Sequence, residues 1–142
     1  MPLPRTALYG LGENLHIAVW PGSDHNTRDI TRFIAREARS FVISVSSLMH
    51  KTDFLEKTPH VDRILMNAPE VLANGGSCIA GPDGEWIVEP QIGKEDLFIA
   101  TLNHNIVKQE RHNFDPSGHY SRPDVTQLHV NRKRQQLVEF DD

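Results

Sequence analysis

Two short apolar runs separated by an amphipathic helical pattern constrain the fold of this chain more than any other feature of its sequence. The runs, Leu15–Val19 and Phe41–Val45, have the length and composition of buried strands. Asn26, with Asp29 three residues later, supplies a cap for the start of the intervening helix. Strand, loop, helix and strand in this order predict a βαβ unit. The apolar residues recur along one helical face: Ile30, Phe33, Ile34, Ala38 and Phe41.

A hairpin is predicted after this unit. Gly75–Ala80 and Glu85–Val88 flank the turn Pro82-Asp83-Gly84, whose residue types favour a tight reversal of the chain. Leu97–Leu102 and Val125–Val130 have the apolar character of two further strands.

The remaining local signals are weaker. Residues 6–9 are expected to form a short helix, and residues 48–74 a surface excursion with one or two helical turns at 61–65. Asn103 is expected to cap a later helix that holds Ile106, Val107 and Glu110. Together these patterns predict the α/β class, with about six strands and two well-defined helices.

Composition excludes several classes of function. The 142 residues have the length of one domain, and their formal net charge of −4 argues against nucleic acid or an anionic membrane as the main partner. No apolar run approaches the roughly 20 residues that a membrane span needs, and Met1–Arg5 lacks the pattern of a signal peptide. The expected location is the cytoplasm, which the single cysteine, Cys78, fits because no internal disulfide can form.

Cysteine and histidine provide little sign of a reactive centre. A lone cysteine such as Cys78 can serve as a nucleophile beside a histidine, but its place in an apolar strand favours a buried, inert thiol. No histidine pair has the spacing of three or four residues that a helical metal site uses, so no metal is expected. The eight histidines are His16, His25, His50, His60, His104, His112, His119 and His129.

Three further patterns favour structural roles. Gly10-Leu11-Gly12 precedes a strand and lacks a third glycine, which argues against a dinucleotide-binding loop. Glu37 lies among arginines on the predicted helix, so we expect it to pair with them as a structural anchor and not to act as a general base. Arg132-Lys133-Arg134 fits a solvated tail.

Five segments in the same order resemble the nitrilase branch of the carbon–nitrogen hydrolases. The third of them is similar to the family pattern IAREGRCFV, with Ala38 and Ser40 as departures, and the fifth is similar to GHYARPDV. The segments are Met1–Tyr9, Leu15–Gly22, Phe33–Val42, Gly75–Glu85 and Gly118–Val125.

The resemblance implies a specific architecture. Family members fold as a four-layer α-β-β-α sandwich made of two related halves, and the matching segments belong to the C-terminal half. Residues 1–130 are therefore expected to form a partial carbon–nitrogen hydrolase domain, and residues 131–142 a polar tail.

The resemblance also implies a chemistry. Complete members convert nitriles to carboxylic acids and ammonia with a cysteine nucleophile, a glutamate base and a lysine, without metal or organic cofactor. All three residues precede the stretch that resembles Met1–Arg5, so no catalytic residue is assigned here and the chain is expected to be inactive alone. Cys78 corresponds to a hairpin cysteine of the family. Trp20 and Pro21 would border the substrate pocket of a complete domain, although a plain loop-packing role for Trp20 remains open.

Two other functions stay under consideration. The chain is a candidate for a non-catalytic assembly or binding module that pairs with itself, with a full nitrilase chain or with a missing N-terminal half, through the predicted helices at 4–12 and 26–40. Strands without a second sheet would leave apolar patches, which favours a homo-oligomer. An independent cysteine hydrolase based on Cys78 and a histidine is the third reading. The expected ligand is a nitrile or amide, bound only in a complete domain.

Overall fold

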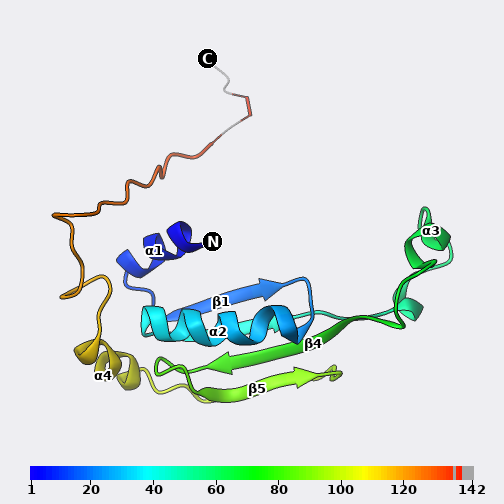
Figure 1. Cartoon of the computed structure of the whole chain (residues 1–142), viewed down its shortest axis with the longest axis horizontal. Helices are drawn as coiled ribbons and strands as arrows, with labels where there is room; N and C mark the ends of the chain where they lie inside the picture. The colour runs from blue at the N-terminus through cyan, green and yellow to red at the C-terminus, as the bar shows by residue number, and fades with distance from the viewer. Residues whose placement is uncertain (136, 139–142) are drawn as a thin grey trace.

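The βαβ unit predicted from the sequence forms the centre of the fold. In the computed structural model, which describes residues 1–135 and 137–138, strand β1 (Leu15–Trp20) and strand β2 (Phe41–Ser46) run parallel. Helix α2 (Asp24–Ala38) connects them and covers one face of the sheet (Figure 1). The two apolar runs are thus confirmed as neighbouring parallel strands, and the chain is mixed α/β.

Helix α2 begins before the predicted cap. Asn26 lies inside the helix, whose N-cap is Ser23 with a φ of 76° and no side-chain capping bond. The first turn is tied instead to Asn74: the Asp24 backbone N–H donates to Asn74 Oδ1 at 2.9 Å, and Asn74 Nδ2 donates to Asp24 Oδ1 at 2.8 Å. The capping partner is therefore 50 residues away in sequence, where a local pattern could not reveal it.

The buried face of α2 agrees only in part with the predicted one: Ile34 and Ala38 are buried and Ile30 packs against the core, but two residues differ. Phe33 is 56% exposed, and Phe41 belongs to β2, where it is buried. Apart from Ile34, the helix presents short side chains to the sheet, and short side chains allow close approach of the two backbones. The buried residues of α2 are Thr27, Thr31, Ile34, Ala35 and Ala38.

The predicted hairpin is confirmed. Strand β4 (Val71–Ala80) and strand β5 (Trp86–Ile92) are antiparallel neighbours, and the turn between them closes with a bond from the Gly81 backbone N–H to the Glu85 carbonyl oxygen at 2.8 Å. Gly84 has a φ of 81°, a left-handed conformation that favours glycine. Strand β4 joins β2 antiparallel, so the sheet runs β1-β2-β4 with β5 beyond.

The excursion at 48–74 has more order than its sequence indicated. Strand β3 (Leu48–His50) pairs with the beginning of β4, and a 3-10 turn (Lys51–Asp53) and helix α3 (Val61–Leu65) follow it. Neither β3 nor the first four residues of β4 was predicted, since each apolar stretch is only two or three residues long. Figure 1 shows this part of the chain projecting beyond one end of the sheet.

Two predicted strands are wrong. Leu97–Leu102 and Val125–Val130 form no strand, and Leu97 and Ile99 are largely exposed. An apolar run becomes a strand only where a sheet edge offers it backbone partners. Helix α4 (Asn105–Asn113) lies between these two segments, where a helix was predicted. Its N-cap is His104 and not the predicted Asn103, but Asn103 Oδ1 still accepts the Asn105 backbone N–H at 3.1 Å.

The polar tail predicted for residues 131–142 falls partly outside the described residues. Residues 131–135 form neither helix nor strand and are exposed. Residue 136 and residues 139–142 lie outside the part of the chain that the structure describes.

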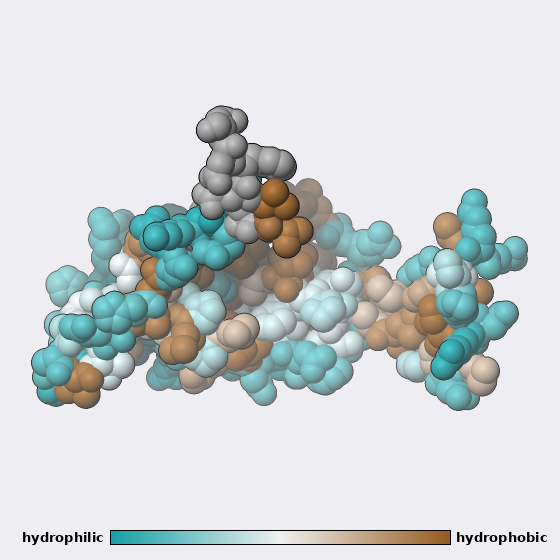
Figure 2. Space-filling view, turned by 90° about the horizontal axis from the view of Figure 1, so that it is seen from above, coloured by the Kyte–Doolittle hydropathy of each residue, from teal (hydrophilic) through white to brown (hydrophobic). Residues whose placement is uncertain are grey.

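Helix α2 covers one face of the sheet, and much of the opposite face is exposed. On the α2 side, Ile34 and Ala35 pack on Val42 and Ala80 to form the core, with Ile30 and Trp86 against it. On the opposite face of β1, Ile17 is 63% exposed and Val19 78% exposed. Figure 2, seen from the β1 side, shows hydrophobic residues near the middle of the molecule. We call the side chains of Leu15, Ile17, Val19, Ile43 and Val45 the open face, since strand pairing places them together.

Helix α1 (Pro2–Gly10) is attached mainly by a polar cluster. Arg5 and Tyr9 are its buried residues, and both donate to Glu37 Oε2 on α2, at 3.0 Å from Arg5 Nη2 and 2.8 Å from the Tyr9 hydroxyl. Burial raises the pKa of Tyr9 to about 12, so this hydroxyl keeps its proton and remains a donor. Glu37 is thus a structural anchor, but the prediction that neighbouring arginines hold it is wrong, because its donors come from α1 and Arg39 pairs with Glu110 instead.

Replacing Glu37 with alanine should loosen α1. The substitution removes the acceptor that Arg5 and Tyr9 share, and we expect a loss of about 1–3 kcal/mol in the free energy of unfolding. Urea unfolding measures the loss, and hydrogen exchange locates it in α1. The matched control is Glu85→Ala, which breaks an exposed 3.4 Å pair with Arg32 and should change little. Equal effects of the two substitutions would contradict the anchoring role.

Candidate functional site

The carboxyl ends of β1 and β2 are the natural place for a site in this sheet. Ligands of α/β sheets bind beyond the carboxyl ends of parallel strands. Here Trp20 ends β1 and Ser46 ends β2, and the two residues are register partners. The loop after Trp20 packs tightly at Gly22, where a Cβ would overlap the Cβ of Ala73 and lie 2.8 Å from the Ser47 carbonyl oxygen.

The two predicted pocket residues occupy this loop in different ways. Trp20 is half-buried, and its indole Nε1–H donates to Ser44 Oγ at 3.2 Å. Pro21 is exposed, and neither residue lines the main cavity described below. Their role beside a substrate therefore stays a prediction.

Two polar side chains that sequence reasoning missed, Ser44 and Thr31, lie next to the Trp20 indole, between β2 and α2. Ser44 Oγ is 2.6 Å from Thr31 Oγ1, and Thr31 Oγ1 is 2.6 Å from the Thr27 carbonyl oxygen. Ser44 and Thr31 are both fully buried between β2 and α2. The only sequence signal was that Ser44 interrupts an apolar strand, since a serine in a buried run needs a hydrogen-bond partner.

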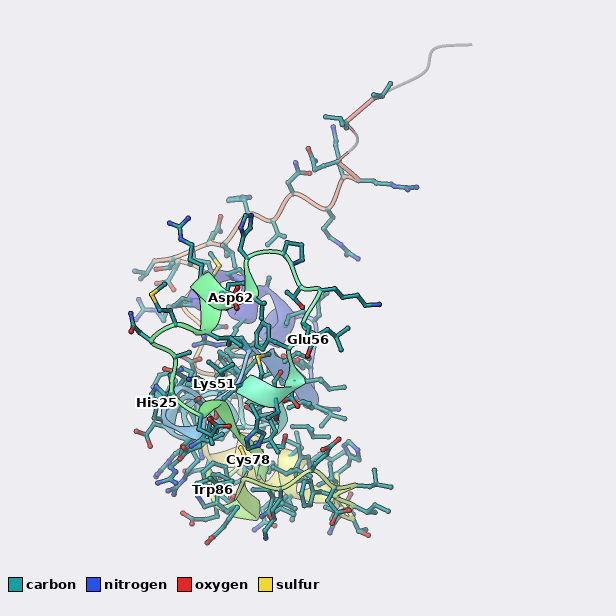
Figure 3. The ribbon with its side chains drawn as sticks, turned by 90° about the vertical axis from the view of Figure 1, so that its right-hand side faces the viewer. His25, Lys51, Glu56, Asp62, Cys78 and Trp86 are labelled. Carbon is teal, nitrogen blue, oxygen red and sulfur yellow. The ribbon has the colours of Figure 1, made fainter. Side chains whose placement is uncertain are left out.

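Cys78 is a buried thiol, as predicted. The side chain is 2% exposed and lies with its Sγ 3.9 Å from Thr31 Oγ1, in the body of the fold (Figure 3). Burial is the main influence on the thiol and raises its pKa, while hydrogen bonds with Thr31 and Ser44 act in the opposite direction. The thiolate is the reactive form of cysteine, so a raised pKa together with burial makes Cys78 a poor nucleophile.

A cavity of about 630 Å³ lies against the uncovered side of the sheet. Apolar side chains of β2, β4 and β5 form its floor, and Leu97 and Phe98 border it from the segment after β5. Asp53 and Lys94 are among its charged residues. Within residues 1–135 and 137–138, no three histidine, cysteine, aspartate or glutamate side chains gather as metal ligands would, and no helix is long and apolar enough to cross a membrane.

Comparison with known proteins identifies the family. No family model matches the chain. A nitrilase-like protein of Saccharomyces cerevisiae is 35% identical over 108 residues, which cover 70% of this chain and 91% of that protein. The chain belongs to the nitrilase family. The resemblance noted in the sequence is therefore confirmed.

Longer nitrilases match almost the whole chain. An aliphatic nitrilase of Sinorhizobium fredii is 34% identical over 138 residues, which cover 97% of this chain and 44% of the relative. Nitrilase 2 of Arabidopsis thaliana is 33% identical over 143 residues, which cover 99% of this chain and 42% of the relative. The chain thus spans less than half the length of these curated relatives.

The burial of Cys78 predicts slow alkylation of this nitrilase chain. We expect iodoacetamide to modify Cys78 on the order of 100-fold more slowly in the folded chain than in urea, because the reaction needs an accessible thiolate. Mass spectrometry over time measures both rates. In the control, Ser121→Cys in a Cys78→Ala background places a thiol at an exposed position and should react at similar rates in both conditions. Rapid alkylation of folded Cys78 would show that the thiol is accessible.

Proposed function

We propose that this chain contributes one half of a nitrilase-type hydrolase and does not supply the nucleophile. The observation that carries the proposal is the state of Cys78, the only cysteine in the sequence, which is buried between sheet and helix with a raised pKa. Nitrile hydrolysis begins when a thiolate adds to the nitrile carbon, so the attacking cysteine must be exposed and easily ionised. Cys78 meets neither condition.

The chemistry proposed for the complete enzyme is the conversion of nitriles to carboxylic acids and ammonia. The thioimidate formed by thiolate attack takes up water and loses ammonia, and a second water cleaves the resulting thioester to release the acid. The relatives named as nitrilases support this reaction type. In this proposal Trp20 and Pro21, at the carboxyl end of β1, border the substrate pocket of the assembled enzyme.

The open face supports the proposed sandwich. A sheet with helices on one face buries its other face against a second layer, and in the α-β-β-α architecture that layer is another sheet. Ile17 and Val19 extend well into solvent from β1, and Val45 continues this apolar surface on β2. We propose that the second sheet of the complete domain packs on this face.

Nitrile hydrolysis tests the proposal directly. We expect the purified chain to release no ammonia above the blank from a panel of aliphatic and aryl nitriles. Co-expression with the N-terminal half of the Sinorhizobium fredii aliphatic nitrilase should produce a complex with activity. That activity should persist in the variant Cys78→Ala.

Two results would count against this function. Ammonia release by the chain alone that Cys78→Ala abolishes would establish an independent cysteine hydrolase. Absence of both complex and activity on co-expression would exclude complementation by that half.

A non-catalytic assembly module is a second candidate, and the same open face favours it. Soluble monomers rarely expose a contiguous apolar surface over neighbouring strands. Strand β1 is also an edge strand, since β2 is its only partner within the described sheet. A second copy of the chain would cover this surface by the same apolar burial that a second sheet provides.

Self-association distinguishes the open face from the helical surface. We expect light scattering after size exclusion to give a mass above that of the monomer, rising with concentration, and Ile17→Lys to lower it by placing a charge in the apolar contact. Phe33→Lys is the matched control, because Phe33 is similarly exposed on α2. If Phe33→Lys alone lowers the mass, the helices form the interface. A sharp monomeric peak at high concentration would rule out self-association.

A further inference from the structure

The directions of the hydrogen bonds below Trp20 are fixed by the groups that take part. The Thr27 carbonyl oxygen can only accept, so the hydroxyl hydrogen of Thr31, 2.6 Å away, points to it. Thr31 Oγ1 is then an acceptor toward Ser44, and the Ser44 hydroxyl must donate across their 2.6 Å contact. The Trp20 indole N–H can only donate, and Ser44 Oγ accepts it at 3.2 Å. A one-way series of bonds therefore runs from Trp20 through Ser44 and Thr31 to the backbone of α2.

Each member of this series depends on the next. Ser44 and Thr31 are 1% and 0% exposed, so solvent water cannot form the hydrogen bond that either hydroxyl would lose with its partner. The Cys78 thiol, 3.9 Å from Thr31 Oγ1, is a weak second donor to that oxygen. With Ser44 donating as well, both acceptor positions of Thr31 are used. In this arrangement the two buried hydroxyls each donate one bond and accept at least one.

We propose that Ser44 and Thr31 are positioning residues that fix the orientation of the Trp20 indole at the carboxyl end of β1. The two hydroxyls belong to β2 and α2, which are rigid elements. They can therefore fix the indole more precisely than contacts from the exposed loop that begins at Pro21. The inference rests on the proposed function only in that Trp20 borders the substrate pocket. There, a fixed indole provides a flat apolar wall for the carbon chain of a nitrile.

The indole N–H of Trp20 reports directly on this series in a nitrogen-15 correlation spectrum. The chain has two tryptophans, and Trp86→Phe assigns their two indole signals. Ser44→Ala should shift the Trp20 signal and speed its exchange with water roughly fivefold to tenfold, because the indole loses its acceptor. Trp86 is the internal control: it lies on β5 with Arg32 over its ring, and its signal should stay in place.

A pair of substitutions at Thr31 separates positioning from packing. Thr31→Val keeps the shape of the side chain and removes its hydroxyl, so Ser44 loses its acceptor and the Trp20 signal should move. Thr31→Ser keeps the hydroxyl and should restore the native signal, even though it removes a methyl group from the core.

Two outcomes would overturn the proposal. One is an unchanged Trp20 signal in Ser44→Ala while the Trp86 signal stays native. The other is a Thr31→Ser spectrum that matches that of Thr31→Val, which would show that packing and not the hydroxyl controls the indole. If Ser44→Ala displaces both indole signals, the Thr31 pair decides the question by itself. None of these measurements uses nitrile hydrolysis, so the proposed function can fail while this inference stands.

Discussion

The close packing of α2 on the sheet is the contact on which the rest of the structure depends. Thr27, Thr31, Ala35 and Ala38 present only short side chains to β2 and β4, so the helix and sheet backbones approach closely. Close approach leaves no room for water between them. A polar group buried in this layer is therefore costly unless it finds a partner inside the protein.

This requirement explains why the layer is both polar and ordered. Ser44 and Thr31 satisfy each other, and Asn74 and Asp24 exchange hydrogen bonds where the helix begins. Such bonds contribute modestly when formed, but an unpaired buried group is costly, so they select one arrangement of helix and sheet. The opposite face has no such constraint, because its exposed apolar side chains fit any layer that excludes water. The α2 side of the sheet thus determines which arrangement of helix and sheet forms, and the opposite side is available for association with another layer.

The parts of the fold that local sequence patterns encode were predicted correctly. Leu15–Val19, Phe41–Val45 and the Pro82-Asp83-Gly84 turn carry their own strand or turn signals, and all three formed as predicted. Asn74 as a capping partner and the Ser44–Thr31 contact depend on segments far apart in the chain, which no periodicity reports. Leu97–Leu102 failed for the converse reason: its residues suit a strand, but in the fold it pairs with no strand of the described sheet.

The same layer decides what Cys78 can do. Removal from water raises the pKa of the Cys78 thiol and is the larger influence, while its contacts with Thr31 and Ser44 act in the opposite direction. An exposed position would reverse that balance, but Cys78 sits opposite Ser44 in the register of β2 and β4, facing α2. Exposing it would require α2 to leave the sheet, which would also break the bonds that hold Trp20. In the proposed function, where Trp20 borders the nitrile pocket, the burial of Cys78 beneath α2 is therefore consistent with a nucleophile supplied by another segment.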